Sequence, residues 1–317
     1  MTLLLSESDV AKLLSMAEVV PAVEQSFKEE GRSGAINSPR TRTAAPGSVL
    51  NVMHASLPYL GRSGTKVYMS TEHGTNFVFL LFDSLRGDLL CVMGADTLGR
   101  YRTGAASAVA TKYLSPLRRF RLAIAGSGRQ ALTQVLALRE VAELEAVCIW
   151  SPSADHREVF ARRLSREYGL EASAHRTVEE AFLGAQVATT ITTSERAFVG
   201  RGALATLTHL NACGANWHDK SEVSPEALAS FSTICVDDLS QSMVESGDLI
   251  LAVKKRRVSW KKVVELKDVV VYRVKPRGKS YFKSNGVAIE DVAVGSLIYD
   301  GAMKRGGFQE VEFRRKQ

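Results

Sequence analysis

Apolar side chains recur at helical spacing near the amino terminus and then at the spacing of strands. Over residues 7–30 they return every three or four positions, which predicts a helix that Pro21 divides into two shorter ones. Extended segments follow at residues 40–45, 49–55, 65–70, 76–82 and 88–93, with turn residues between them. Because no helix separates these segments, they predict an antiparallel sheet.

From about residue 115 the pattern becomes an alternation of strands and helices. Strands are expected at residues 121–125, 146–150, 171–175, 187–191, 209–213 and 233–236, and helices at 130–141 and 154–168. Such alternation is typical of a parallel sheet with crossover helices. Two more helices are expected at residues 103–113 and 288–303. The 317 residues accommodate about two domains, so we predict an α/β protein whose second part is a doubly wound parallel sheet.

A glycine-rich turn lies between the first strand of this alternation and the helix after it. It has the form G-x-G-x-x-A and consists of Gly126, Ser127, Gly128, Arg129, Gln130 and Ala131. The first glycine permits a tight turn, the second lets the backbone approach a pyrophosphate, and the small last residue lets the helix pack on the strand. Free N–H groups at the start of the helix then face the anion. The turn predicts a dinucleotide site, with a tight turn that binds nothing as the alternative.

The end of the next strand bears on the choice of nicotinamide cofactor. An acidic residue there binds the ribose 2′-hydroxyl of NAD and repels a 2′-phosphate. This chain instead has Ser151 and Ser153, with Arg157 downstream, and its first carboxylate is Asp155. Hydroxyls and a cation suit a phosphate, so we predict NADP in preference to NAD. The same residues also suit the cap and first turn of a helix, and both roles are compatible.

Four cations of the first part are candidates for binding an anion. Arg40 and Arg42 are two apart on an expected strand and therefore share a face. Lys66 begins another strand, and Arg102 opens the helix rich in small residues. Because arginine binds carboxylates through two parallel hydrogen bonds, these side chains form a candidate carboxylate clamp. Their spacing alone agrees equally well with separate solvated charges.

Composition narrows the class of protein. The net charge is +7 and 45% of the residues are hydrophobic, as in globular proteins. The longest apolar stretch, residues 77–82, is too short to span a membrane, and the four cysteines form no paired motif, which favours a reducing, cytoplasmic setting. Basic clusters at residues 254–262 and 314–316 allow nucleic-acid binding, but they are also typical of solvated segments. No histidine pair has the spacing of metal ligands. We therefore expect no nucleic acid, membrane or metal partner.

Several blocks of the sequence resemble the ornithine cyclodeaminase/mu-crystallin family. The most specific are RTGAASA at residues 102–108 and SNGVAIED at residues 284–291. Further blocks occur in the family's order at residues 39–41, 64–67, 126–134, 192–194, 209–216 and 245–248, so the resemblance covers almost the whole chain.

The resemblance implies a nicotinamide cofactor, a small amino or imino acid substrate, a homodimer and two domains. Residues 115–287 would form the Rossmann dinucleotide-binding domain, and residues 1–114 with 288–317 an α+β substrate-binding and dimerisation domain. Arg40, Lys66 and Arg102 match the positions that hold the substrate carboxylate, and Arg42 competes with Arg40 because the local alignment can slide by two residues. Cofactor contacts are implied for the glycine-rich turn and for Thr103, Thr192, Ser194, Ser284 and Asn285.

One departure from the family bears on the reaction. In the cyclodeaminases an Asp that takes the proton from the substrate amine follows a Gly-Gly or Gly-Ala pair, whereas this chain has Asn216 there. A neutral amide forms hydrogen bonds but cannot act as a general base. Reduction of a protonated imine needs no base at that place, so we predict Lys66, Arg102 and Asn216 as the catalytic residues of an NAD(P)H-dependent oxidoreductase. Its expected substrate is a small cyclic ketimine carboxylate, pyrroline-2-carboxylate or piperideine-2-carboxylate, and its product an L-amino acid.

Two kinds of alternative stay open at this stage. The chain could oxidise an amine with NAD+, as an ornithine or lysine cyclodeaminase or an L-amino-acid dehydrogenase, if Lys66 or a water supplies the base. It could also bind NADPH and a small anion without catalysis, as mu-crystallin-like members do.

Overall fold

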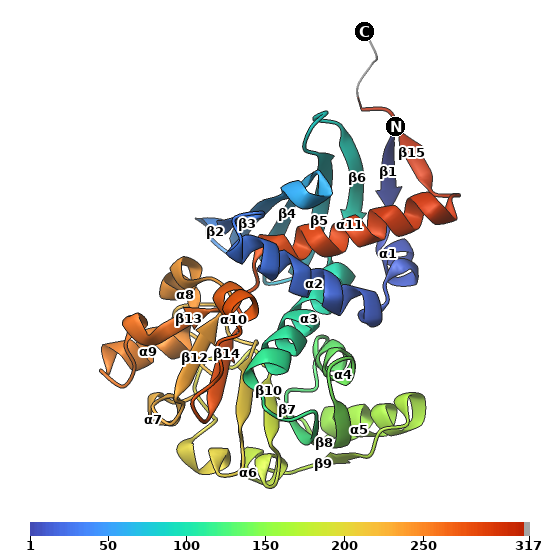
Figure 1. Cartoon of the computed structure of the whole chain (residues 1–317). Coiled ribbons are helices and arrows are strands. Elements are labelled where there is room, and N and C mark those ends of the chain that lie inside the picture. Colours follow the sequence, from blue (N-terminus) through green and yellow to red (C-terminus); the bar gives the residue numbers. More distant parts are fainter. Residues whose placement is uncertain (314–317) are drawn as a thin grey trace. The chain divides into compact units, whose positions relative to one another are not determined.

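The computed structural model describes residues 1–313, so the basic tail at residues 314–316 lies outside the described part. The chain forms two compact units (Figure 1). The first unit comprises Met1–Ala105 and the segment from Gly286 onward, and the second unit is Ala106–Asn285. The first division falls inside helix α3 (Asp96–Leu114), whereas the sequence placed the boundary at the end of that helix.

The first unit contains a seven-stranded sheet with the order β15-β1-β6-β5-β4-β3-β2. Its strands are β1 (Thr2–Leu5), β2 (Ile36–Ala45), β3 (Ser48–Leu57), β4 (Arg62–Thr71), β5 (Gly74–Asp83), β6 (Leu89–Gly94) and β15 (Gln309–Val311). The antiparallel pairing predicted for β2 to β6 is found, and β1 adds a parallel strand beside β6. The sequence analysis missed both β1 and β15, which have only four and three residues.

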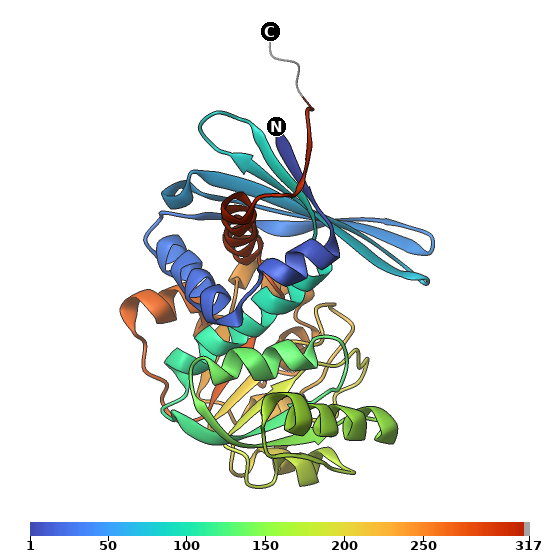
Figure 2. The same ribbon diagram turned by 90° about the vertical axis from the view of Figure 1, so that its right-hand side faces the viewer.

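One face of this sheet is buried by helices. Side chains alternate along the strands, so Met53 and Ala55 of β3 and Phe79 and Leu81 of β5 lie on the covered face. Helix α11 (Ala288–Arg305) packs against strands β2 to β5 and against α2 (Met16–Gly31). Figure 2 shows both helices on the same side of the sheet. Helix α11 therefore belongs to the first unit, far along the chain from the strands that it covers.

Pro21 does not divide the amino-terminal helix, contrary to the prediction. The break lies between α1 (Glu7–Leu13) and α2 (Met16–Gly31), and Pro21 is inside α2. Proline removes the hydrogen bond to the carbonyl four residues earlier, here that of Ala17. Both Pro21 and Ala17 are exposed, so that carbonyl faces water and the helix continues.

The second unit is built on eight strands, and all their pairings are parallel, in the order β13-β12-β14-β11-β10-β7-β8-β9. The strands are β7 (Arg119–Ala125), β8 (Glu143–Trp150), β9 (Ala172–Ala174), β10 (Val187–Thr190), β11 (His209–Ala212), β12 (Thr233–Val236), β13 (Val263–Glu265) and β14 (Ser280–Lys283). The helices are α4 (Ala131–Arg139), α5 (Ala154–Tyr168), α6 (Val178–Phe182), α7 (Pro225–Leu228), α8 (Leu239–Glu245), α9 (Gly247–Lys254) and α10 (Leu266–Tyr272). This confirms the predicted fold class, although the sequence analysis missed β13 and β14.

The strand order of this sheet reverses at a defined position. From β7 the chain proceeds outward through β8 and β9 on one side, and through β10 and β11 on the other. Ligands of doubly wound sheets bind at the carboxyl ends of the strands where the order reverses, which here is between β7 and β10. Both faces of the sheet are covered, with Val135 and Phe160 in one apolar core and Phe182 and Leu249 in the other.

The structure also describes features that the composition drew attention to. No helix within residues 1–313 has both the length and the apolar character needed to cross a membrane. All four cysteines are free thiols buried in the protein. The basic residues Lys254, Lys255, Arg256, Arg257 and Lys261 are exposed around the end of α9.

Candidate active site

Three cations from separate elements of the first unit are buried together. Arg40 on β2, Lys66 on β4 and Arg102 on α3 are only 9%, 2% and 8% exposed. Lysine and arginine are almost never buried unless they are paired. The structure thus brings together the three residues that match the family's carboxylate-binding positions.

Two carboxylates from the first turn of α11 hold this cluster. Asp291 Oδ1 lies 2.7 Å from Lys66 Nζ and 3.2 Å from Arg102 Nε. Glu290 Oε2 lies 2.8 Å from Arg102 Nη1. Arg40 donates from Nη2 to the carbonyl of Gly286 over 3.0 Å. The amino-terminal end of one helix therefore contacts all three cations.

The electrostatics of Lys66 suggest what this cluster can bind. Burial lowers the pKa of Lys66 to about 8, and the positive charges of Arg102 and Arg40 act in the same direction. Asp291 opposes the shift but does not cancel it. The charged form of Lys66 is therefore incompletely stabilised, and an anion placed beside it would improve its environment.

Gly286 is required where the chain enters α11. Its φ of +80° is in the region that side chains rarely adopt, and a Cβ there would lie 2.2 Å from Arg102 Nη1. Any larger residue would displace the guanidinium, so the glycine of the SNG block shapes the cation cluster.

Arg42 has a different environment from Arg40. The pairing of β2 with β3 is interrupted by a bulge between Ser38 and Thr41, after which Arg42 is opposite Asn51. Arg42 Nε donates to Asn51 Oδ1 over 3.0 Å, and Arg42 is half-buried. Arg40 lies within this bulge, and Arg42 lies in the regular pairing beyond it. The structure places Arg40 beside Lys66 and gives Arg42 a partner on β3.

The glycine-rich turn of the second unit has the geometry expected of a pyrophosphate site. Gly126 has φ +127°, and a Cβ on it would lie 2.4 Å from the carbonyl oxygen of Ile191. A Cβ on Gly128 would meet nothing within 4 Å, so the backbone there borders open space. Ala131 is fully buried at the start of α4. Gln130 caps this helix without a side-chain hydrogen bond, and Arg129 is exposed. These residues fit a dinucleotide.

The end of β8 is joined to this turn by hydroxyl groups. The Ser127 hydroxyl donates to Ser151 Oγ over 2.8 Å, and Ser151 Oγ donates to the carbonyl of Ser153 over 3.1 Å. Arg157 Nη1 donates to the carbonyl of Ser151 over 2.9 Å, and Ser153 caps α5. The predicted helix-cap role is therefore present, with a cation held at the end of β8.

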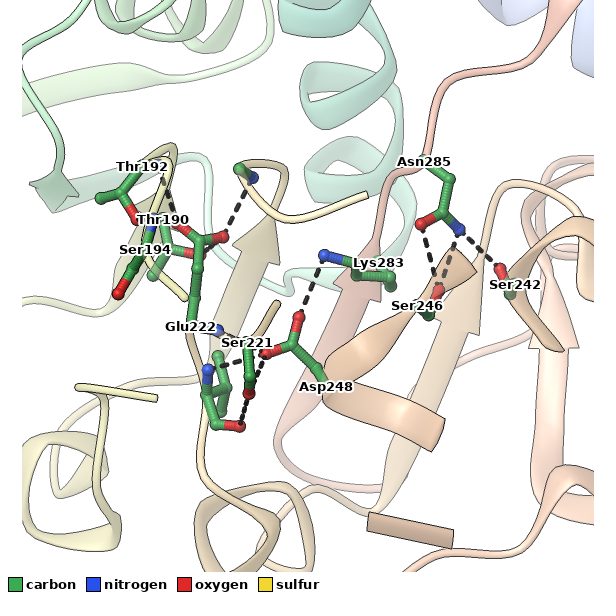
Figure 3. A network of polar contacts seen from close by, with 12 residues as sticks. Thr190, Thr192, Ser194, Ser221, Glu222, Ser242, Ser246, Asp248, Lys283 and Asn285 are labelled. Carbon is green, nitrogen blue, oxygen red and sulfur yellow. Dashed lines mark hydrogen bonds and ion pairs between the residues drawn. The ribbon is translucent and has the colours of Figure 1, made fainter. Parts of the chain in front are cut away.

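The remaining predicted cofactor residues of the second unit follow strands that end at the same edge. Thr192 and Ser194 follow β10, while Ser284 and Asn285 follow β14. Asn285 Nδ2 donates to Ser242 and Ser246 over 2.8 and 2.9 Å (Figure 3). Among the described residues, the buried hydroxyl of Ser284 has no hydrogen-bond partner. Such an orphaned group at this edge fits a polar ligand.

The last two predicted residues are Thr103 and Asn216. Thr103 is in the part of α3 that belongs to the first unit, and its hydroxyl donates to the carbonyl of Gly99 over 2.7 Å. Asn216 is half-buried in the second unit, in the segment after β11.

Sequence reasoning missed three buried carboxylates that organise these sites. Glu290 and Asp291 stand in the SNGVAIED block, which was recognised as a motif without a role for its acids. Glu222 is fully buried in the second unit, and no motif used in the sequence analysis pointed to it. An isolated acid in sequence gives no sign of burial, because its donors come from distant segments.

The chain is similar to known proteins over almost its whole length. The profile of the ornithine cyclodeaminase/mu-crystallin family matches residues 1–306. The ketimine reductase mu-crystallin of Macropus fuliginosus is 29% identical over 93% of this chain and 96% of that protein. The structure of Thermococcus litoralis Delta(1)-pyrroline-2-carboxylate reductase with NADH and L-proline is 30% identical, with a TM-score of 0.93 over 98% of this chain and 100% of that chain. An archaeal alanine dehydrogenase dimer with bound NAD is 28% identical, with a TM-score of 0.92 over 99% of each chain.

Replacing Asp291 by Asn should destabilise the first unit. The change removes the negative charge shared by Lys66 and Arg102. Removing one partner of a buried ion pair lowers the free energy of unfolding by about 3 kcal/mol. Urea unfolding of the purified chain measures the loss. Asp300→Asn is the control, because its ion pair with Arg62 is half exposed and should contribute less than about 1 kcal/mol. Equal losses for the two variants would contradict this account of Asp291.

Proposed function

This chain belongs to the ornithine cyclodeaminase/mu-crystallin family, and from that premise we propose that it reduces a small cyclic ketimine carboxylate to an L-amino acid with NAD(P)H. Pyrroline-2-carboxylate and piperideine-2-carboxylate are the proposed substrates. The observation that carries the proposal is the buried cluster of Arg40, Lys66 and Arg102, in which Lys66 keeps a lowered pKa despite its contact with Asp291.

Each residue of the cluster has a role in the proposed reaction. The substrate carboxylate binds Lys66 and the guanidinium groups of Arg40 and Arg102, which can make paired hydrogen bonds to it. Asp291 and Glu290 hold Lys66 and Arg102 in place from α11. The glycine-rich turn would hold the pyrophosphate of a nicotinamide cofactor, and that cofactor would supply the hydride for the imine carbon when bound. The ring nitrogen is protonated before the hydride arrives, so no base is needed.

The direction of the reaction depends on Asn216. Oxidation of an ammonium substrate requires a group that removes a proton, and an amide cannot do so. Reduction of a protonated imine requires none, which favours the reductase. One observation favours oxidative deamination as a second candidate function: the lowered pKa of Lys66, about 8, would let its neutral amine act as a base.

We further propose that NADP is the preferred cofactor. The relatives with bound cofactors contain NADH and NAD, so a nicotinamide dinucleotide is the common feature. The preference is our inference from the end of β8, where Ser151 and Ser153 stand in place of a carboxylate and Arg157 is held by the Ser151 carbonyl.

The first unit has a surface suited to a second copy of this chain. The face of its sheet opposite α11 carries Leu50, Val52, Val67, Val78 and Leu80, and Val78 is 43% exposed. Contiguous apolar surface of this kind favours association. The archaeal alanine dehydrogenase relative is a dimer, and we propose that this chain is one also, a state that light scattering reports directly.

The reductase is tested by following NADPH absorbance with the two cyclic imines. The wild-type chain should consume NADPH and form the corresponding L-amino acid. Lys66→Ala and Arg102→Ala should each lower kcat/KM at least about ten-fold, because each removes a charged contact to the carboxylate. Arg42→Ala serves as the matched control and should retain most activity, since Arg42 contacts Asn51. Ammonia release from ornithine, or ligand binding without turnover, would reject the proposal.

The pH dependence separates reduction from oxidation. Lys66 is charged below its pKa of about 8 and neutral above it, so carboxylate binding should weaken as the pH rises through that value. For a reductase, kcat/KM for the imine should therefore decline above about pH 8. If Lys66 were a base for amine oxidation, activity would instead rise toward that pH. Lys66→Arg, which stays charged, should shift the decline to higher pH if it is active.

Cofactor preference is tested by comparing NADPH with NADH. The wild-type chain should have the lower KM for NADPH. Ser151→Asp should reverse the preference by about ten-fold or more, because its carboxylate repels the 2′-phosphate and accepts from the ribose hydroxyl. Arg157→Ala should raise the KM for NADPH and leave that for NADH nearly unchanged. A wild-type preference for NADH would contradict the inference drawn from the end of β8.

A further inference from the structure

A single buried carboxylate joins two segments at the edge of the parallel sheet. Glu222 is fully buried, and its two oxygens accept four hydrogen bonds (Figure 3). Oε1 accepts from the backbone N–H and the hydroxyl of Thr192, each over 2.7 Å. Oε2 accepts from the Thr190 hydroxyl over 2.8 Å and from the Gly214 N–H over 2.9 Å. The carboxylate therefore ties the end of β10 to the segment that follows β11.

The first of these segments, at the end of β10, borders the glycine-rich turn. Thr190 is opposite Ala125, the last residue before Gly126. Ile191, between the two threonines that Glu222 binds, has the carbonyl oxygen that a Cβ on Gly126 would approach to 2.4 Å. A displacement of the Ile191 carbonyl would therefore also displace Gly126, the first glycine of the turn.

The segment that follows β11 is also closely packed, at Gly214. A Cβ on Gly214 would lie 2.2 Å from the Thr192 carbonyl oxygen and 2.4 Å from Glu222 Oε1. Gly214 also begins the Gly214-Ala215-Asn216 stretch. The position of the Asn216 segment thus depends on the same carboxylate.

The backbone at Glu222 is itself held by Asp248, which forms a buried ion pair with Lys283. Asp248 Oδ1 accepts from the backbone N–H groups of Glu222 and Val223 over 2.7 and 2.8 Å, and from the Ser221 hydroxyl over 3.0 Å. Asp248 Oδ2 lies 3.0 Å from Lys283 Nζ, at the end of β14 (Figure 3). Asp248 therefore fixes the backbone from which Glu222 reaches the two segments.

We propose that Glu222 is a positioning residue of the nicotinamide site, which holds the segments after β10 and β11 in the conformation that binds the cofactor. The inference rests on the cofactor part of the proposed function. It does not require Glu222 to touch the cofactor, and it does not depend on which imine is reduced.

The pattern of donors makes Glu222→Gln a sharp test. Each carboxylate oxygen faces one hydroxyl, which can turn to accept, and one backbone N–H, which cannot. In either orientation the glutamine NH2 would oppose the N–H of Thr192 or of Gly214. One segment must therefore move or leave a buried donor without an acceptor.

The experiment measures NADH and NADPH binding by fluorescence, in the absence of any imine and well below the melting temperature of each variant. Glu222→Gln should raise the Kd about ten-fold or more. Glu226→Gln is the matched control, since it makes the same charge change four residues on at an exposed position and should leave the Kd unchanged. If Glu222→Gln folds and binds as the wild type does, the proposal is wrong. If the wild-type chain binds neither dinucleotide, the proposed function itself fails.

Thr190→Val provides a second variant and a test of coupling. It removes one donor to the carboxylate and keeps a strand-forming shape, so it should raise the Kd a few-fold in the wild-type background. In the Glu222→Gln background it should add little, because the carboxylate through which it acts is gone. A residue with only a general structural role would lower the melting temperature without this non-additivity. Fully additive effects on the Kd, or no effect of Thr190→Val alone, would overturn the proposal.

Discussion

Burying three like charges beside one another is the constraint on which the first unit depends. Arg40, Lys66 and Arg102 repel one another and lose their hydration, so the arrangement requires carboxylates at short range. Asp291 and Glu290 supply them from the first turn of α11, where the helix dipole also favours negative charge. The return of the chain's last helix to the first unit is therefore a requirement of the site as well as of the apolar core.

In the second unit, a buried carboxylate serves a different purpose, because it accepts hydrogen bonds from backbone N–H groups. Parallel strands end together, and the segments beyond them present backbone N–H groups that the sheet no longer pairs. Near β7, such groups remain available for an anion at the start of α4. Near β10 and β11, Glu222 satisfies them and fixes the segments. The edge is thus divided between groups suited to a ligand and groups that are already satisfied by the protein.

The parts of the fold that the sequence predicted are those determined by local pattern. The bounds of α5 follow from periodicity. The place of the glycine-rich turn follows from Gly126, because its φ of +127° and the nearby carbonyl of Ile191 both require a glycine. The short strands β1 and β15 were missed because three or four residues carry no readable period. Pro21 was misjudged because its effect depends on exposure. The burial of Glu222 depends on donors from β10 and β11, which no local pattern reveals.

The lowered pKa of Lys66 connects the buried charges to substrate binding. Asp291 leaves the ammonium incompletely stabilised, so a substrate carboxylate placed beside it would favour the charged form and raise the pKa again. Near pH 8, binding of the proposed substrate would therefore be accompanied by proton uptake at Lys66. If Asp291 neutralised Lys66 completely, the cluster would be a stable ion pair with little affinity for an anion. In the proposed function, this incomplete compensation would let the cluster bind an anion, which a fully neutralised salt bridge would not do.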